Sequence, residues 1–274
     1  MNFVTYNVPA ALAETYRGRK LVVRFHDSAE LQQVLLALHP DDLLYLQLLL
    51  PTTTSADLMQ WGEGVPIDIV MSSPEAEFPQ LYRFAELLER HPVRVSIPVV
   101  PGFSKAVKLA VALNLTVKLE VDQPKPALVE EMMQVLEYYL HHSTVTQPID
   151  FFHNTLLAFY HKDPVTLWMI QEEDPVYFRY VTEQGEEMVA RRLAGTALQG
   201  ECGVDEKFSQ EIRAEDQECC HCEFREHCAG YFKWPRQEYS CGGVKTLFRT
   251  LQHAAGELRQ DLGMYLRADL EQRP

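Results

Sequence analysis

The chain has 274 residues, 46% of them hydrophobic, and a formal net charge of −14 at pH 7. This length is enough to bury the core of one large domain and a small second module. The acidic charge argues against nucleic acid and anionic membranes as partners, because binding to either depends on clustered lysine and arginine. No apolar run approaches the roughly 18 to 20 residues that cross a bilayer, so a membrane span is not expected.

The first half of the chain alternates strand-like apolar runs with segments of helical spacing. Five runs are predicted strands: Lys20 to Phe25, Leu43 to Leu50, Pro66 to Met71, Val93 to Val100 and Thr116 to Val121. Predicted helices run from Ala29 to His39 with Ser28 as N-cap, from Phe78 to Arg90, from Lys105 to Leu113 with Ser104 as N-cap, and from Ala127 to His141. Strands separated by such helices pair in parallel with right-handed crossovers. The sequence therefore predicts an α/β fold with a largely parallel sheet.

Two polar features follow the last of these strands. Glu172, Glu173 and Asp174 offer carboxylates for acid-base catalysis, but a solvated turn before Pro175 is the favoured interpretation in so acidic a chain. His153 lies in an aromatic, apolar segment, where a core histidine is favoured over a ligand or proton shuttle.

Five of the six cysteines lie in one short stretch, and none precedes Cys202. Cys219 and Cys222 form a C-x2-C knuckle, Cys228 follows after five residues, and Cys241 follows after twelve more. Four thiolates at this spacing can converge on one metal centre, because the knuckle directs two sulfurs into one turn and the last gap lets the chain return. Cys202 and Cys220 are left over, and we expect both to be neutral thiols.

The spacing leaves the identity of the metal open. Structural zinc sites with four cysteines usually pair two C-x2-C knuckles, whereas an iron-sulfur cluster tolerates uneven spacing. A 4Fe-4S cluster is therefore favoured, with structural zinc as the alternative. Disulfides rank last, because no signal peptide opens the sequence and the thiols of a cytoplasmic protein stay reduced. We expect a cytoplasmic protein.

The run C-x2-C-x5-C followed by Ala229 and Gly230, with a later cysteine, resembles one half of a SPASM domain. This domain is the C-terminal extension of many radical S-adenosylmethionine enzymes that modify peptides, and it binds auxiliary iron-sulfur clusters. The positions that match the ligands of its second cluster are Cys219, Cys222, Cys228 and Cys241. Phe232 occupies the place of the family's fourth cysteine, and the upstream G-x4-C element has no counterpart. The resemblance thus implies one auxiliary cluster.

The same family binds its catalytic cluster through C-x3-C-x2-C near the start of a partial (β/α) barrel. Because no cysteine precedes Cys202, no S-adenosylmethionine-binding cluster is expected. The resemblance implies a partial barrel over residues 1–190 and a SPASM-like iron-sulfur module with a C-terminal helix over residues 191–274. Loops at the carboxyl ends of the strands would line the barrel mouth. They are Pro51 to Thr54, Ser72 to Glu75, Pro101 to Ser104 and Asp122 to Pro126.

A final helix is predicted from Val244, with an apolar face that should pack on the larger domain. This face consists of Val244, Leu247, Phe248, Leu251, Ala255, Leu258 and Leu262.

Two classes of function remain. The first is a non-catalytic relative of the radical enzymes, a binding or accessory partner in peptide or small-molecule modification that acts beside a catalytic radical enzyme or holds a precursor peptide. The second is a stand-alone enzyme or electron-transfer protein that uses the cluster and the barrel mouth. A structural zinc protein is a third possibility. Four thiolates close a site to substrates, so such a site serves structure or electron transfer more readily than Lewis-acid catalysis, which favours the first class.

Overall fold

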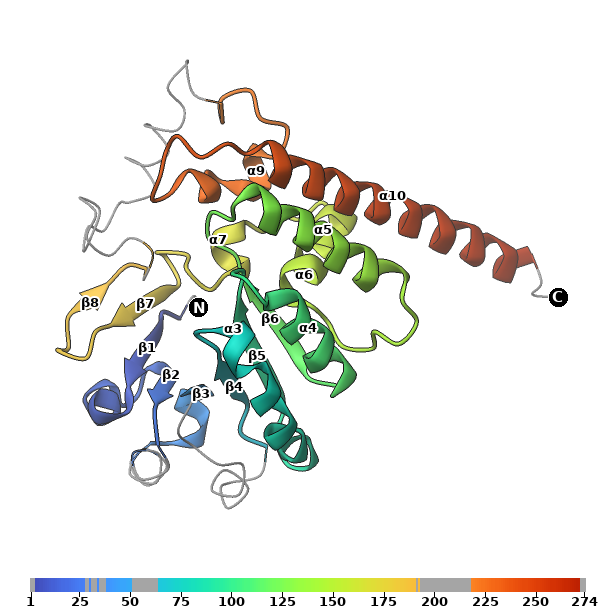
Figure 1. The fold of residues 1–274 in the computed structure, drawn as a ribbon. Helices are drawn as coiled ribbons and strands as arrows, with labels where there is room; N and C mark the ends of the chain where they lie inside the picture. Colours follow the sequence, from blue (N-terminus) through green and yellow to red (C-terminus); the bar gives the residue numbers. More distant parts are fainter. Residues whose placement is uncertain are drawn as a thin grey trace.

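The computed structural model describes residues 3–27, 30, 34, 38–50, 64–190, 192 and 218–271, with side chains described as far as residue 262. These residues form an eight-stranded sheet with the order β6-β5-β4-β3-β2-β1-β7-β8 (Figure 1). The strands are β1 (Thr5–Pro9), β2 (Lys20–Phe25), β3 (Leu43–Leu49), β4 (Ile67–Val70), β5 (Val93–Pro98), β6 (Thr116–Glu120), β7 (Phe178–Val181) and β8 (Glu187–Met188). All neighbours pair in parallel except β7 and β8, which are antiparallel.

The predicted α/β class and largely parallel sheet are confirmed, and the five predicted strands correspond to β2 to β6. Strands β1, β7 and β8 were not predicted. Strand β1 pairs with β2 on one side and with β7 on the other, so it lies inside the sheet. The outer strands β6 and β8 are two separate ends of the sheet in the described part of the chain.

The two faces of the sheet differ in polarity. Because successive strand residues point to opposite faces, the apolar runs place one set of side chains in the core. That set includes Val23, Leu48, Ile69, Val95 and Leu119, all fully buried. The alternate positions are polar, and the strand register aligns Arg24, Gln47, Asp68 and Arg94 in one row across β2 to β5. The sheet thus has one apolar face and one polar face.

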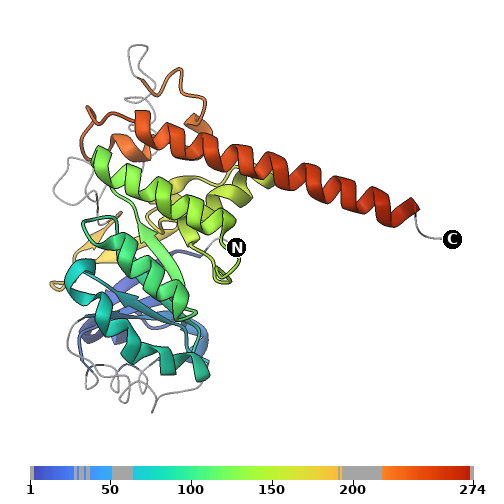
Figure 2. The ribbon, with the colours of Figure 1, turned by 45° about the vertical axis from the view of Figure 1, so that its right-hand side comes forward.

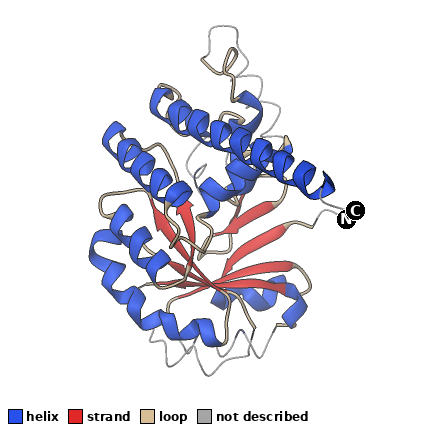
Figure 3. Ribbon diagram, turned by 90° about the vertical axis from the view of Figure 1, so that its right-hand side faces the viewer, coloured by secondary structure: helices blue, strands red, loops and turns tan. Residues whose placement is uncertain are grey.

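Helices cover the apolar face, and they lie outside the strands in Figure 3. Those between the strands and after β6 are η1 (Ala10–Tyr16), η2 (Pro40–Asp42), α3 (Pro74–Glu77), η3 (Phe78–Glu89), α4 (Phe103–Ala112), α5 (Pro126–His141), α6 (Asp150–His161) and α7 (Leu167–Ile170). The N-cap of α4 is Gly102 rather than the predicted Ser104. Gly102 has a φ of +89°, and a Cβ there would lie 2.6 Å from the Cβ of Glu75, so only glycine fits this close approach.

Much of the predicted helix from Ala29 to His39, including its proposed cap Ser28, lies outside the described residues. Glu30 and Val34 are helical. The amide of Glu30 donates a hydrogen bond of 3.0 Å to the Asp27 side chain, as expected when Asp27 acts as the N-cap.

The C-terminal part contains α9 (Arg225–Cys228), η5 (Tyr231–Lys233) and the long helix α10 (Gly242–Glu271). Helix α10 packs on α5 and α6 and then extends beyond the rest of the molecule (Figures 1 and 2). Its predicted apolar face is buried from Val244 to Ala255. The prediction was wrong for Leu258 and Leu262, which are 39% and 44% exposed, because the supporting helices end before them. None of the helices in the described residues is both long and hydrophobic enough to span a membrane.

Candidate functional site

A cavity of about 420 Å³ lies on the polar face of the sheet. Its walls are residues of the polar face of the sheet, the turn from Gln171 to Glu173, strand β7, and Val189 and Ala190 directly after β8. Ser72, Pro98 and Glu120 line it where β4, β5 and β6 end. In parallel sheets, ligands bind at the carboxyl ends of the strands, so this position is the expected one for a binding site.

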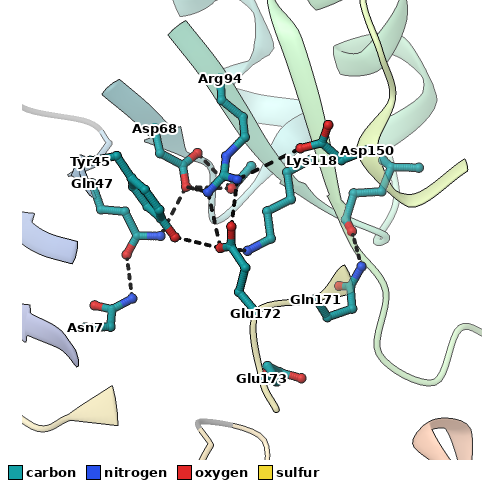
Figure 4. A network of polar contacts seen from close by, with 12 residues as sticks. Asn7, Tyr45, Gln47, Asp68, Arg94, Lys118, Asp150, Gln171, Glu172 and Glu173 are labelled. Atoms are coloured by element: carbon teal, nitrogen blue, oxygen red, sulfur yellow. Dashed lines mark hydrogen bonds and ion pairs between the residues drawn. The ribbon is translucent and has the colours of Figure 1, made fainter. Parts of the chain in front are cut away.

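Glu172 is the centre of a charged network beside this cavity (Figure 4). Its carboxylate accepts two hydrogen bonds from Arg94, of 2.8 and 3.2 Å, and one of 2.5 Å from Nζ of Lys118. The hydroxyl of Tyr45 donates a fourth, of 2.6 Å. Burial raises the pKa of Glu172, but Lys118 and Arg94 lower it more, so the net pKa lies well below the usual range. Glu172 is therefore a fixed anion.

Asp68 and Asp150 complete the network around Arg94. Asp68 accepts hydrogen bonds from Arg94 at 3.0 Å, from the Ser96 hydroxyl at 2.8 Å and from the Gln47 amide at 3.1 Å. Asp150 lies 3.9 Å from Arg94. Burial raises the pKa of Asp150 to about 6, and the nearby guanidinium of Arg94 offsets only part of that effect. Asp150 thus changes protonation near neutral pH while Glu172 does not.

The four predicted cysteine ligands line a second pocket, in the C-terminal part. Cys219 and Cys222 belong to one turn, in which the amide of Cys222 donates to the carbonyl of Cys219 at 3.3 Å. Cys228 is the last residue of α9, and Cys241 directly precedes α10. Three phenylalanines also line the pocket, Phe224, Phe232 and Phe248, together with charged side chains that include Glu218, Lys233 and Lys245. The chain therefore brings the four thiols to one pocket with aromatic and charged walls.

The backbone after α9 is what turns the chain back toward the knuckle. Ala229 and Gly230 have φ values of 46° and 71°, in the left-handed region, and they end the helix directly after Cys228. Left-handed residues at this position are the usual way in which a helix ends. Ala229 and Gly230 of the motif thus end the helix and reverse the chain direction directly after Cys228.

Burial disfavours the thiolate forms in this pocket. Burial, with a smaller contribution from neighbouring cysteines, raises the pKa of Cys228 to about 12 and that of Cys241 to about 11. Two cations line the same pocket: Lys233 and Lys245 contact opposite oxygens of Glu218 at 2.8 and 2.5 Å. Thiolates would form here when a metal supplies positive charge.

The four thiols have to meet the geometric requirements of a metal. The described residues contain no group of three or more His, Cys, Asp or Glu side chains placed to hold a metal ion, so the predicted metal-binding module is not shown as a formed site. A single zinc ion needs four sulfurs at about 2.3 Å from one point. A cubane cluster instead takes one sulfur at each iron, so four thiols around an apolar pocket suit a cluster chemically.

No protein-family model, curated protein or solved structure matches the chain.

A wall of packed aromatic side chains lies between the cavity and the cysteine pocket. Tyr231 donates a hydrogen bond of 3.1 Å to Glu173, which lines the cavity, and its ring lies edge-on to Phe232 with centroids 5.4 Å apart. Phe232 lines the cysteine pocket. Trp168 donates to the carbonyl of Ala229 at 3.1 Å and ties the same wall to the end of α9. The two sites are thus joined by packed aromatic side chains.

The predicted mouth loops are divided among different sites. Ser72 lines the cavity, whereas Gln123 to Pro126 line a separate groove beside Tyr239. The loop from Pro51 to Thr54 lies outside the described residues, as does Cys202. Cys220 is half-buried and does not line the cysteine pocket, and its prediction as a non-ligand stays a prediction.

Sequence reasoning missed the charged network. The interpretation of Glu172 as part of a solvated turn was wrong, since its side chain is only 23% exposed and bound to two cations. Arg94 and Lys118 lie in the predicted strands Val93 to Val100 and Thr116 to Val121, for which no charged network is predicted from the sequence. Each is a charged residue at an alternate position of an apolar run, and this was the signal available in the sequence. His153 is half-buried and its ring contacts the Tyr139 hydroxyl at 2.9 Å, consistent with a core histidine.

Proposed function

We propose that this chain is an iron-sulfur protein related to the radical S-adenosylmethionine enzymes with SPASM domains, and that it acts as a binding or accessory partner in peptide or small-molecule modification. The observation that carries the proposal is the convergence of Cys219, Cys222, Cys228 and Cys241 on one aromatic-walled pocket. The same pocket contains neither Cys220 nor any histidine.

The four thiols would hold one 4Fe-4S cluster, and zinc is the alternative. A cluster would supply electron transfer or structural stability, because four protein ligands leave no iron open to substrate. Phe224, Phe232 and Phe248 would exclude water from it, which adjusts the reduction potential of such groups.

The strand order supports a partial (β/α) barrel. Strands β1 to β6 are parallel and adjacent in chain order, and their polar side chains share one face with a cavity. We assign residues 1–190 to this barrel and residues 191–274 to the SPASM-like module. The sequence lacks the C-x3-C-x2-C motif of a radical initiator, since its first cysteine is Cys202. A cytoplasmic radical enzyme, a precursor peptide, or both would be the partners.

The alternative is a stand-alone enzyme or electron-transfer protein. The observation in its favour is the cavity, which is lined by Glu172. Glu172 belongs to the same network as Asp150, whose pKa is raised by burial, and packed aromatic side chains connect the cavity to the cysteine pocket. Turnover of a small molecule by the protein alone would support this alternative.

The metal is tested by anaerobic purification followed by iron, sulfide and zinc analysis. We expect about four irons and four sulfides per chain, as one cubane requires. Cys228→Ala should lose the iron and Cys220→Ala should keep it, which makes Cys220 the matched control. A colourless protein with one zinc would refute the cluster, and loss of iron in both variants would refute the assignment of ligands.

The accessory role is tested by an anaerobic pull-down of the intact protein from its native cell, with mass spectrometry of the bound material. Recovery of a cysteine-rich radical enzyme or a short precursor peptide would support it. Recovery of neither, together with turnover by the isolated protein, would overturn it.

A further inference from the structure

Two cations that line the cavity, Arg24 and Lys118, already have anionic partners in the protein. Arg24 pairs with Glu183 at 3.3 Å, and Lys118 pairs with Glu172 at 2.5 Å. The strand register places the side chain of Arg179 on the opposite, apolar face of the sheet. An anionic ligand would therefore lose its hydration without gaining a free cation.

The carboxylates beside the cavity are also occupied. Glu172 accepts four hydrogen bonds, which come from Arg94, Lys118 and the Tyr45 hydroxyl. These fill the roughly four lone-pair sites that a carboxylate offers. Glu173 accepts from Tyr231, and Glu120 has an interaction within the protein. A cationic ligand would gain no free anion either, so the charges favour a neutral ligand.

The hydrogen-bonding capacity that remains beside the cavity belongs to donors, and Lys118 has most of it. Its ammonium group has three N–H bonds, and its acceptor within the described part of the chain is Glu172. The side chain of Lys118 is only 7% exposed. A polar group buried to this degree requires acceptors, and the cavity that it lines is where a ligand can supply them.

A chain of hydrogen bonds on the same face of the sheet orients two amide side chains that line the cavity. Arg24 donates to Oδ1 of Asn7 at 2.7 Å. Nδ2 of Asn7 donates to Oε1 of Gln47 at 2.9 Å, and Nε2 of Gln47 donates to Asp68 at 3.1 Å (Figure 4). The cation at one end and the anion at the other determine which way both amides are turned. Each amide thus keeps a second N–H that has no acceptor among the residues described.

The rest of the lining suits an extended ligand with apolar groups. Gln47 on β3 and Lys118 on β6 are three strands apart, roughly 14 Å at about 4.8 Å between neighbours, so one compact group does not reach both donors. The volume of about 420 Å³ is within the range of small-molecule sites. The same face offers apolar and aromatic surface from Leu49, Val70, Phe178 and Tyr180.

We propose that the cavity binds a short, neutral peptide segment in extended form. Its backbone carbonyl oxygens would accept hydrogen bonds from Lys118 and from the amides of Gln47 and Asn7, and its apolar side chains would lie against Phe178 and Tyr180. A peptide unit offers a strong acceptor without net charge, which is the chemistry that free donors and balanced charges select. The inference names the ligand class for the proposed binding role and rests on that role, but not on the metal at the cysteines.

The ligand class is tested with a pooled library of tripeptides that are acetylated at the N-terminus and amidated at the C-terminus. Peptides retained by the intact protein are identified by mass spectrometry and measured by calorimetry. Each is compared with isosteres in which an alkene replaces one peptide bond, because this keeps the shape and removes the acceptor. We expect the peptide to bind about ten-fold more tightly than at least one isostere, and a free carboxylate or amine at its end to weaken binding. Retention of no peptide, equal affinity of peptide and isosteres, or tighter binding of a charged form would overturn the inference.

A variant locates the donor. Lys118→Met keeps an unbranched side chain and removes the N–H groups, so the peptide should bind about ten-fold more weakly and no better than its isostere. A general loss of packing would weaken both ligands and keep the difference between them. If the unpaired Glu172 unfolds this variant, Lys118→Met is combined with Glu172→Gln to remove both charges. The control is Lys108→Met, the same change at an exposed position of α4, which should keep the wild-type difference. A wild-type difference in the folded Lys118 variant would refute the assignment.

The outcome is separable from the other proposals. Folded Cys228→Ala that has lost its iron should still bind the peptide more tightly than its isostere, and loss of this difference would contradict a site that works without the cluster. Iron-loaded protein that binds no peptide would refute this inference alone and leave the cluster in place. Recovery of a radical enzyme from the cell, without peptide binding in the cavity, would likewise refute this inference and support the accessory role.

Discussion

At the scale of single residues, the carboxylate of Glu172 lies where side chains of β3, β5 and β6 converge. Its backbone has a φ of 59°, a conformation that residues other than glycine adopt at some cost. The ion pairs offset this cost and fix the turn between α7 and β7. This turn forms one wall of the cavity.

Glu172→Gln should lower the free energy of unfolding by about 3 kcal/mol at pH 7, because Arg94 and Lys118 would lose the anion that neutralises them. The folded-state pKa of Glu172 lies below its unfolded value, so the contribution is present above about pH 4.3 and is lost as the pH falls through the folded pKa. When urea unfolding is measured from pH 7 to pH 3, the free energy of unfolding should therefore fall less steeply in the variant than in the wild type. Glu223→Gln, 51% exposed, is the control and should change little.

Asp150 should show the opposite dependence. Its pKa rises from 3.8 to about 6 in the folded protein, so the folded state binds the proton more tightly and stability falls as the pH rises between these values. This difference between the unfolded and folded pKa values lowers the free energy of unfolding by at most about 3 kcal/mol above pH 6. Asp150→Asn should thus be more stable than the wild type at pH 8 and equal to it at pH 4. Equal stability at both pH values would contradict the burial argument.

The charge of a single residue, Lys233, also matters beside the cysteine pocket. It is 8% exposed and lines the cysteine pocket, where its positive charge favours the reduced form of a cluster. Lys233→Met should lower the midpoint potential by on the order of 60 mV, a ten-fold change for one electron. The measurement is a redox titration followed by electron paramagnetic resonance on iron-loaded protein. Arg249→Gln should keep the wild-type potential.

At the scale of elements, α10 has a supported half and an unsupported half. Leu251 is fully buried and Leu258 is 39% exposed, although both belong to the same predicted face. Leu251→Ala should therefore lower the free energy of unfolding by about 2 to 5 kcal/mol, and Leu258→Ala should lower it by about 0.5 kcal/mol or less. Guanidinium unfolding of the two variants makes the comparison, and equal losses would mean that the outer half of the helix is also packed.

The same helix illustrates how far the sequence predicts the fold. Periodicity gave the apolar face and the central strands, because both depend on local patterns of burial. It did not predict the residue of α10 beyond which the apolar face is no longer covered, because this depends on where α5 and α6 end. Strand β1 was missed because Thr5–Pro9 is short and ends in proline, and β8 has only two residues. Their pairing comes from tertiary contacts rather than local propensity.

The candidate site was predictable in part for a similar reason. Cysteine spacing is local, so the four residues of the pocket were identified. The network of Glu172 joins residues from β3, β4, β5, β6 and a turn, and only the strand register brings them together. Charged residues at alternate strand positions could have indicated a polar face, but not which carboxylate would neutralise it.

At the scale of the whole molecule, the chain should not cleave S-adenosylmethionine reductively. Three cysteines would be needed to hold the site-differentiated cluster, and the first cysteine is Cys202. Incubation of the anaerobic protein with reductant and S-adenosylmethionine should therefore yield no 5′-deoxyadenosine above a protein-free control. Its formation by this chain alone would contradict the proposed non-catalytic role.

The position of β1 also has a consequence for biosynthesis. One edge of β1 pairs with β2, which follows it closely, but the other edge pairs with β7, whose first residue is Phe178. A ribosome must therefore add most of the chain while the N-terminal strand carries an unpaired edge. Unpaired strand edges recruit other chains and favour aggregation. The nascent protein should consequently depend on holding chaperones until β7 has emerged from the exit tunnel.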